Sequence, residues 1–196
     1  MAIRLIAGLG NPGRRHERDR HNVGFWLAQR LAARHRAELR LEPRYQALVA
    51  QLPLEAADAW LVLPQTYMNL SGHSVGALAR FYKVAPEEVL ALHDELDFEP
   101  GIAKLKRGGG VAGHNGLKDI VASLGSQGFW RLRIGIGHPG DKALVADYVL
   151  CAPRPAEREA IEQALERSLE VFPLIERGQM EAAMLKLHTR TEPGNS

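Results

Sequence analysis

Apolar residues occur along the chain in blocks of two kinds, and these blocks predict alternating strands and helices. Short apolar runs closed by glycine, proline or charged residues predict buried strands, whereas apolar residues spaced three and four apart predict helices. The expected strands are 3–9, 45–52, 60–63, 89–92, 102–105 and 131–137, with an edge strand at 147–150. The expected helices begin near Val23, at a cap formed by Asn69 or Ser71, at Asn115, at Glu157 and at Gln179.

Strands and helices that alternate in this way predict an α/β fold. We expect a single-domain, twisted, mixed β-sheet flanked by helices on both faces, formed by residues 1–191, with a loose tail at 192–196. The helix from Glu157 to Phe172 is strongly amphipathic and should break or kink at Pro173, because proline lacks the amide hydrogen that continues a helix.

Composition and charge narrow the function only slightly. The chain is 45% hydrophobic and 24% charged, as in an ordinary globular protein, and a net charge of +2 does not by itself imply nucleic acid. Residues 14–44 nevertheless carry nine arginines against four acidic residues, while the chain from Arg154 onward is slightly acidic. This asymmetry fits a one-sided anion-binding surface, and equally well a set of arginine-rich solvated helices.

Cys151 is the only cysteine, which excludes a disulfide framework and a cysteine-based zinc site. The chain has no apolar run of about 18 residues and no signal-like N-terminal segment, so we expect a cytoplasmic protein.

Two glycine-rich stretches are candidate loops for an anionic ligand. The pattern G-x-G-x-x-G at 8–13 invites a dinucleotide-binding interpretation, but a charged stretch follows Gly13 in place of a helix, and Pro12 removes a backbone donor. The segment 104–119 contains five glycines in sixteen residues and starts with three cations within four residues. It is typical of a loop that meets a polyanion at a helix start, although a plain glycine hairpin would share the pattern.

Polar side chains follow several of the predicted strands. Asn11 follows the first strand and Asp94 the fourth, Asn69 and Asn115 lie at helix starts, and His21 precedes the first helix. Because ligands of α/β sheets bind outside the carboxyl ends of strands, these residues are candidates for one pocket.

The residue types in that pocket suit base catalysis on water. A carboxylate on one ring nitrogen of a histidine leaves the other nitrogen free to accept a proton, and asparagine amides can orient water and stabilise an oxyanion. His21 with Asp94 would form such a pair, although a histidine at a helix start can also be a cap or a surface residue. No serine or cysteine nucleophile motif is present, and the histidines lack the spacing of a metal site. Asp94, Glu95 and Asp97 could hold Mg²⁺, but solvated or helix-capping carboxylates are the commoner case.

Taken together, the motifs resemble those of bacterial-type peptidyl-tRNA hydrolases. The matching stretches are GLGNPG at 8–13, RHN at 20–22, YMNLSG at 67–72, HDELD at 93–97, GHNGLKD at 113–119 and RLRIGIGHPG at 131–140. Each motif alone is weak, but the set is specific because it spans nearly the whole chain in order.

The resemblance implies cofactor-free hydrolysis of the ester between a peptide and the 3′-terminal ribose of tRNA. Apart from the resemblance, we expect no metal site, and the small size of the chain predicts a monomer. The resemblance also implies that His21 is the general base, that Asp94 orients it, and that Asn11 holds the peptide backbone beside the ester. The remaining residues implied to contact the substrate or its tRNA are His16, Tyr67, Met68, Asn69, His114 and Asn115 in the groove, and Lys106 and Arg133 on the 5′-phosphate.

The chain departs from the family pattern at four positions. The family usually has tyrosine at 16 and threonine at 19, where this chain has His16 and Asp19, and commonly has His-Gly where this chain has Val111 and Ala112. These departures bear on substrate affinity more than on catalysis. Two other functions share some of the sequence features: a non-catalytic RNA-binding relative, and a nucleotide-dependent oxidoreductase that uses the first glycine loop.

Overall fold

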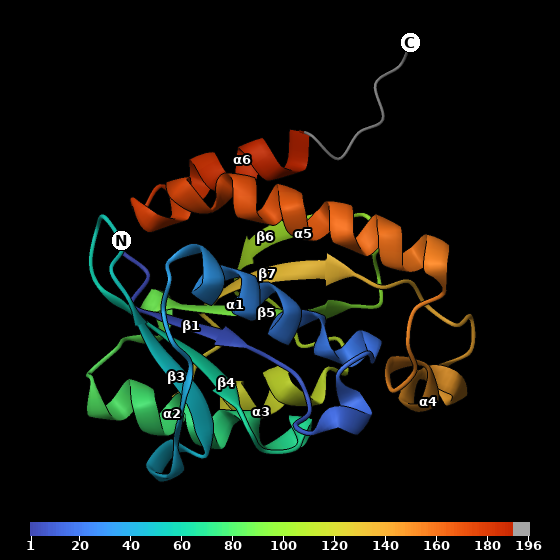
Figure 1. The fold of residues 1–196 in the computed structure, drawn as a ribbon, viewed down its shortest axis with the longest axis horizontal. Helices are drawn as coiled ribbons and strands as arrows, with labels where there is room; N and C mark the ends of the chain where they lie inside the picture. Colours follow the sequence, from blue (N-terminus) through green and yellow to red (C-terminus); the bar gives the residue numbers. More distant parts are fainter. Residues whose placement is uncertain (190–196) are drawn as a thin grey trace.

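The computed structural model, which describes residues 1–189, contains one mixed seven-stranded sheet in the order β2-β3-β4-β1-β5-β7-β6 (Figure 1). Strands β1, β4, β5 and β7 are parallel to their neighbours in the centre, whereas β2–β3, β3–β4 and β6–β7 pair antiparallel. The strands are β1 (Leu5–Gly8), β2 (Arg40–Glu42), β3 (Ala47–Leu52), β4 (Ala59–Pro64), β5 (Val89–Glu95), β6 (Ala103–Arg107) and β7 (Trp130–Gly135).

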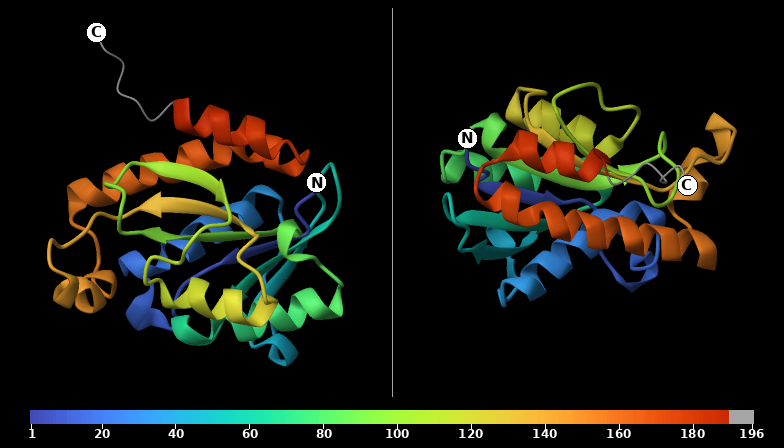
Figure 2. Two further views of the ribbon diagram at one scale, coloured as in Figure 1. Left: turned by 180° about the vertical axis from the view of Figure 1, so that it is seen from behind. Right: turned by 90° about the horizontal axis from the view of Figure 1, so that it is seen from above.

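Helices cover both faces of this sheet, so the predicted fold class is confirmed (Figures 1 and 2). One face carries α1 (Val23–Arg34), α5 (Pro155–Glu176) and α6 (Met180–Thr189), and the other carries α2 (Ser71–Phe81) and α3 (Asn115–Leu124). The central strands are apolar on both faces: Leu90 and Leu92 of β5 join the core under α1, while Val89 and Ala91 join the core under α2 and α3. This explains why they appear in the sequence as continuous apolar runs.

The segment predicted as an edge strand at 147–150 is instead a helix, α4 (Val145–Val149). Val145 and Val149 are four residues apart and both face the protein, which is helical spacing. Tyr148 between them packs its ring against the Arg20 guanidinium at 3.8 Å and donates its hydroxyl to the carbonyl of Ile136 at 2.6 Å. These tertiary contacts hold the short helix beside the ends of the central strands.

Pro173 does not break the last long helix, because α5 continues through it to Glu176. Proline leaves the carbonyl of Leu169, four residues earlier, without its helical donor. Arg34 of α1 replaces that donor with a side-chain hydrogen bond of 2.6 Å to the Leu169 oxygen. The expected interruption is therefore absorbed by a contact between two helices.

The cap predicted for α2 is also different. Neither Asn69 nor Ser71 accepts a capping hydrogen bond; the Ser71 hydroxyl donates to the carbonyl of Met68 at 2.7 Å. The carboxylate of Asp119, on α3, accepts the Gly72 amide at 2.7 Å. The start of α2 is thus capped from the neighbouring helix, and the starts of the two helices are tied together.

Strand β2 was not predicted, and all three of its residues are exposed at the sheet edge. The remaining predicted strands and helices are observed with small shifts of their ends. The expected loose tail at 192–196 lies outside the described residues. None of the helices within residues 1–189 combines the length and the apolar character that a membrane span requires.

Candidate active site

The N-terminal end of α1 lies directly against the carboxyl ends of β1 and β5. A Cβ atom on Gly24 would lie 2.2 Å from the Leu92 oxygen and 2.6 Å from the Leu9 oxygen, so only glycine allows this approach. A Cβ on Gly8 would likewise collide with Ala28 of α1. Gly8 and Gly24 therefore serve helix–sheet packing, and this packing brings His21 to the end of β5.

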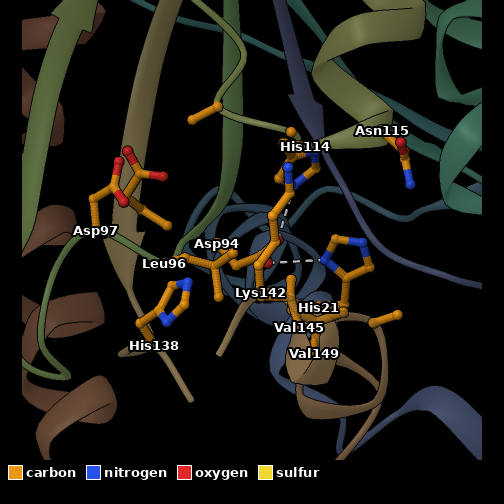
Figure 3. A pocket seen from close by; sticks show the side chains of 14 residues that line it. His21, Asp94, Leu96, Asp97, His114, Asn115, His138, Lys142, Val145 and Val149 are labelled. Carbon is orange, nitrogen blue, oxygen red and sulfur yellow. Dashed lines mark hydrogen bonds and ion pairs between the residues drawn. The ribbon is translucent and has the colours of Figure 1, made fainter. Parts of the chain in front are cut away.

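At that point His21 meets Asp94, as the sequence predicts. The Nδ1 atom of His21 lies 2.8 Å from Oδ2 of Asp94, and the other carboxylate oxygen, Oδ1, lies 2.9 Å from Nε2 of His114 (Figure 3). The His21 and His114 ring centroids are 5.0 Å apart. Asp94 is 3% exposed and His21 is 9% exposed, so one buried carboxylate serves two imidazoles.

The hydrogen bonds define the tautomers of the two rings. The Nδ1 atom of His114 accepts the Leu117 amide at 3.3 Å and so caps α3, which leaves its Nε2–H to donate to Asp94. His21 donates Nδ1–H to Asp94, so its Nε2 keeps a lone pair that can accept a proton. This is the arrangement that a general base requires.

The contact between His21 and Asp94 shifts the pKa of both side chains. Burial lowers the pKa of His21, but the charge of Asp94 and its hydrogen bond outweigh burial and raise that pKa above its ordinary value, with a smaller contribution from Asp19. Burial raises the pKa of Asp94, but the charges and hydrogen bonds of His21 and His114 hold it well below its usual range. Asp94 therefore remains ionised at neutral pH.

Asn11 is fixed from two sides. Its backbone amide donates to Oδ1 of Asn22 at 2.8 Å, and the Asn22 amide group donates to the Asn11 carbonyl at 2.9 Å. The side-chain oxygen of Asn11 accepts the Met68 amide at 2.8 Å. The Asn11 side-chain nitrogen consequently remains as a donor for a ligand.

Two cavities meet at His21. The first, named the asparagine cavity, has a volume of about 440 Å³ and holds most of the predicted groove residues. The second, named the aspartate cavity, has a volume of about 470 Å³ and includes Asp94 and His114. The site residues of the asparagine cavity are Asn11, His16, His21, Tyr67, Met68, Asn69 and Asn115. His21 and Asn115 line both cavities, as do Ala146 and Val149 of α4.

Lys106 and Arg133 lie outside both cavities, on the β6–β7 pair. In this antiparallel pair Lys104 is opposite Arg133 and Lys106 is opposite Arg131, so all four cations share one face. The alternate apolar residues of both strands (Ala103, Leu105, Trp130, Leu132 and Ile134) are buried on the other face, under α5 and α6. Lys106 is exposed, and Arg133 is half-buried with its NH1 atom 3.5 Å from Glu95.

The glycine-rich segment after β6 forms a loop that leads to His114 and Asn115. Arg131, which is 2% exposed, donates from NH1 to the carbonyl of Gly110 and so ties the loop to the sheet. Ala112, one of the departures from the family pattern, has φ +48°, a left-handed conformation that favours glycine. Val111 packs partly buried against the core near α3.

The other two departures interact with each other. Nδ1 of His16 lies 2.7 Å from Oδ2 of Asp19, so Asp19 pairs with His16. Arg20, the neighbour of Asp19 in the chain, does not pair with it: Arg20 pairs with Glu157 at 2.8 Å and donates to the carbonyls of Tyr148 and Cys151.

Sequence reasoning missed three contributors to the site. Asn22 fixes Asn11, and its place directly after His21 in the chain is the sequence signal that could have assigned it to the site. Arg20 and the cavity-lining residues of α4, Ala146 and Val149, were missed as well. Their roles depend on contacts between residues that lie more than 120 positions apart in the chain.

Within residues 1–189, the histidines and carboxylates close enough to share a metal ion are His21, Asp94 and His114, whose ligand atoms lie within 4.8 Å of one another. The acidic trio of Asp94, Glu95 and Asp97 is not brought together in this way. Two imidazoles and one carboxylate would suit zinc better than magnesium. Both Asp94 oxygens are already hydrogen-bonded to the imidazoles, so the set is complete as a hydrogen-bonded unit.

The fold and the site together define a class: a single-domain α/β protein with a mixed sheet, in which a buried histidine–aspartate pair lies at the carboxyl ends of parallel strands. The family model described as peptidyl-tRNA hydrolase matches residues 5–194. The chain belongs to the peptidyl-tRNA hydrolase family.

Individual relatives agree with this assignment. The chain is 55% identical to the peptidyl-tRNA hydrolase of Nitrosomonas europaea over 98% of both chains, and 54% identical to that of Delftia acidovorans over 97% of this chain and 92% of the relative. The crystal structure of peptidyl-tRNA hydrolase from Acinetobacter baumannii superposes with a TM-score of 0.92 at 44% identity, covering 94% of each chain.

Proposed function

We propose that this protein hydrolyses the ester bond between the peptide and the 3′-terminal ribose of peptidyl-tRNA, and so recycles tRNA from stalled or aborted translation in the cytoplasm. The observation that carries the proposal is the His21–Asp94 pair, which leaves Nε2 of a buried histidine free at the junction of two cavities. An ester of peptide and ribose has two unlike halves, and a base at the junction can act on the bond that joins them.

In the proposed reaction His21 takes a proton from a water molecule through Nε2. The hydroxide attacks the ester carbonyl, and the tetrahedral oxyanion is stabilised by amide donors of the pocket. When the intermediate collapses, the C–O bond to the ribose breaks, and the departing 3′ oxygen receives the proton from His21. The products are a peptide with a free carboxylate and a tRNA with a free 3′-hydroxyl.

The asparagines are proposed to position the substrate. The side-chain nitrogen of Asn11, which has no hydrogen-bond partner within residues 1–189, is suited to donate to a peptide carbonyl, which would favour N-blocked substrates over aminoacyl-tRNA. Asn69 and Asn115 are proposed to orient the ester and the water, because both line the asparagine cavity beside His21. Tyr67, Met68 and His114 complete the groove, and no metal or cofactor takes part in the proposed steps.

The tRNA is proposed to bind across the cationic face of β6 and β7, with Lys106 and Arg133 on its 5′-phosphate. Two observations support tRNA binding at this face. Its cations point in one direction, and the Nε atom of Arg133 is buried without a hydrogen-bond partner among the described residues. Phosphate contacts of this kind position an RNA without reading its sequence. We further propose that the protein acts as a monomer.

The test is single-turnover release of the acyl group from an N-acetylated aminoacyl-tRNA in the presence of EDTA. The parent should cleave, and His21→Ala should lose about 10²- to 10⁴-fold in rate, the usual contribution of a general base. His73→Ala, at an exposed position on α2, is the matched histidine control and should cleave like the parent.

Two results would contradict the proposal. A parent that binds tRNA but releases no acyl group would be an RNA-binding module without turnover. Loss of cleavage with EDTA alone would make the His21, Asp94 and His114 set a metal centre.

A further inference from the structure

Arg131 of β7 is buried against the glycine-rich loop that connects β6 to α3. It is one of the largest fully buried side chains among the described residues, at 2% exposure. Its guanidinium lies 4.6 Å from the centroid of the Phe129 ring and donates from NH1 to the carbonyl of Gly110. Arg131 is therefore not placed to meet a phosphate at the surface, which separates it from Lys106 and Arg133.

The burial of this cation is unfavourable in itself. Burial, followed by the charge of Arg133, lowers the pKa of Arg131. Its Nε and NH2 atoms are buried without a hydrogen-bond partner within residues 1–189, so NH1 alone is satisfied there. An uncharged side chain of similar length would fill the same space at a lower cost in free energy. The hydrogen bond to the loop is the feature that only a long cationic donor supplies.

The glycine-rich loop has few other hydrogen bonds to the sheet. Four of the residues from 108 to 113 have positive φ values, from +48° to +97°, so the backbone conformation alone does not hold the loop. A hydrogen bond of 2.9 Å from the Gly108 amide to the Phe129 carbonyl fixes its start. Within residues 1–189, the bond from Arg131 to Gly110 is the next one that joins the loop backbone to the sheet.

Four residues after Gly110 the loop reaches His114, whose ring is bonded on both nitrogens. Its Nδ1 accepts the Leu117 amide at 3.3 Å, and its Nε2–H donates to Oδ1 of Asp94 at 2.9 Å (Figure 3). The other oxygen of Asp94 accepts Nδ1–H of His21 at 2.8 Å. A displacement of the loop would therefore reach the proposed general base through His114 and Asp94.

We propose that Arg131 is a positioning residue for the general base: by holding Gly110 it keeps His114 in the orientation that donates Nε2–H to Asp94. Asp94, held on one oxygen, then presents the other oxygen to His21. The inference rests on the proposed function, because it connects a residue that lines neither cavity to the catalytic pair.

The first test separates kcat from binding. Arg131→Met removes the donor and the charge but keeps an unbranched chain against Phe129. Its kcat on N-acetylated aminoacyl-tRNA should fall about 10- to 100-fold, because small displacements of reacting groups have effects of this size. The Kd for full-length tRNA and the slope of log Kd against log salt should not change, because Arg131 meets no phosphate.

Two further variants complete this comparison. Arg131→Lys keeps the charge but lacks the planar fork, so its kcat should lie between those of Arg131→Met and the parent. Arg107→Met is the matched control, because Arg107 is exposed and donates to the Gly128 carbonyl, outside the loop; its kcat should equal that of the parent. Thermal melting establishes which variants are folded. Arg131→Lys suffices if Arg131→Met does not fold, since positioning requires its kcat to be below that of the parent.

The second test examines the route through His114. An asparagine at this position can still cap α3 by accepting the Leu117 amide, but it has no atom in the place of Nε2. His114→Asn should therefore lose the contact with Asp94 and keep the helix start. If Arg131 acts through His114, the double variant Arg131→Met with His114→Asn should be no slower than the slower single variant.

The third test needs no turnover. In ¹⁵N NMR spectra of the histidine rings, the parent should show His114 protonated on Nε2, with slow exchange of that proton because it is bonded to a buried carboxylate. In Arg131→Met this signal should broaden or exchange rapidly, whereas Arg107→Met should retain it. His114→Asn identifies the signal by its disappearance. A role confined to packing would lower the melting temperature and leave this signal unchanged.

Three results would overturn the inference. The first is a parent-like kcat in a folded Arg131 variant, and a flatter salt dependence with that kcat would assign Arg131 to a phosphate. The second is a fully additive loss of kcat in the double variant, and the third is an intact His114 signal in Arg131→Met. A parent that cleaves nothing would contradict the proposed function, while the His114 signal would still test the positioning by Arg131.

Discussion

His21 and His114 share Asp94: one imidazole bonds to each oxygen of the same buried carboxylate, at 2.8 Å and 2.9 Å. The two rings use opposite nitrogens for this contact. His21 donates from Nδ1 and leaves Nε2 free, whereas His114 donates from Nε2 and uses Nδ1 to cap α3. One histidine is thus placed for chemistry, and the other fixes the carboxylate and the start of a helix.

The first prediction concerns the pH dependence of catalysis. A base must be neutral to accept a proton, and the pKa of His21 is raised, so kcat/KM should rise with pH through a midpoint above the ordinary value of 6.5. In Asp94→Asn the charge that raises this pKa is lost and burial, which lowers it, remains. The midpoint should therefore fall below that of the parent, and the plateau rate should drop about 10²- to 10⁴-fold. Profiles of kcat/KM from pH 5 to 9 measure both effects; an unmoved midpoint would separate Asp94 from the titration of His21.

The second prediction concerns recognition of the peptide by Asn11. Its side-chain oxygen accepts the Met68 amide, so the aspartate of Asn11→Asp can keep that bond but has no donor for a ligand carbonyl. The kcat/KM for N-acetylated aminoacyl-tRNA should fall about 10- to 100-fold, because a carboxylate then faces a carbonyl oxygen. Cleavage of unblocked aminoacyl-tRNA should change much less, so the ratio of the two rates is the decisive value. An unchanged ratio would assign discrimination to another residue.

The third prediction concerns the cationic face of β6 and β7. Lys106→Ala and Arg133→Ala should each weaken binding of full-length tRNA about 10-fold at low salt and should make log Kd less steep in log salt by about 0.7 to 0.9. Affinity for the isolated trinucleotide CCA should not change, because neither side chain lines the cavities. Lys186→Ala, exposed on α6 across the sheet, is the matched control. Equal effects of all three variants would indicate a general charge effect.

The sequence predicted the central strands well because they are buried on both faces, and such strands leave an unambiguous apolar run. The prediction was wrong at 147–150, where three consecutive apolar residues give the pattern of a short strand. The helix α4 depends on contacts of Tyr148 with Arg20 and Ile136, which local periodicity does not contain. Pro173 is a similar case, because the side chain that compensates for it comes from Arg34 on another helix.

For the candidate site, the contact between His21 and Asp94 could be predicted from the sequence. Asp94 follows a predicted strand and His21 precedes the first predicted helix, and these two ends lie at the same edge of the sheet. The sharing of Asp94 with His114 could not be predicted. It depends on the conformation of the glycine-rich loop, which Arg131 fixes through the carbonyl of Gly110. The His16–Asp19 pair lies within one turn of the chain, but the sequence does not show that His16 lines the asparagine cavity.

The last prediction concerns stability in mild acid and depends on His93, next to Asp94 in β5. His93 is 1% exposed; its Nδ1–H donates to the carbonyl of Asp94 at 2.7 Å, and its Nε2 is buried without a partner among the described residues. Burial, followed by the charge of His114, lowers the pKa of His93 to about 3. The folded protein therefore keeps this imidazole neutral where the unfolded chain protonates it.

The sign follows from proton linkage. Between the unfolded pKa of 6.5 and the folded pKa of about 3, the unfolded state binds the extra proton, so the free energy of unfolding falls as the pH falls. By pH 5 this one residue should remove about 2 kcal/mol. The raised pKa of His21 acts in the opposite direction, since its stabilisation is present below pH 6.5 and is lost as the pH rises. Asp94 stays ionised throughout this range.

The contribution of His93 is isolated by comparing pH dependences, because only the difference between two variants cancels the other groups. His93→Asn keeps a donor for the Asp94 carbonyl and does not titrate. It should lower the free energy of unfolding at pH 7 through the lost ring volume, yet it should lose about 2 kcal/mol less than the parent between pH 6.5 and pH 5. Urea denaturation at the two pH values gives this difference, and His73→Asn should behave like the parent. Parallel pH dependences in His93→Asn and the parent would show that His93 is protonated in the folded protein.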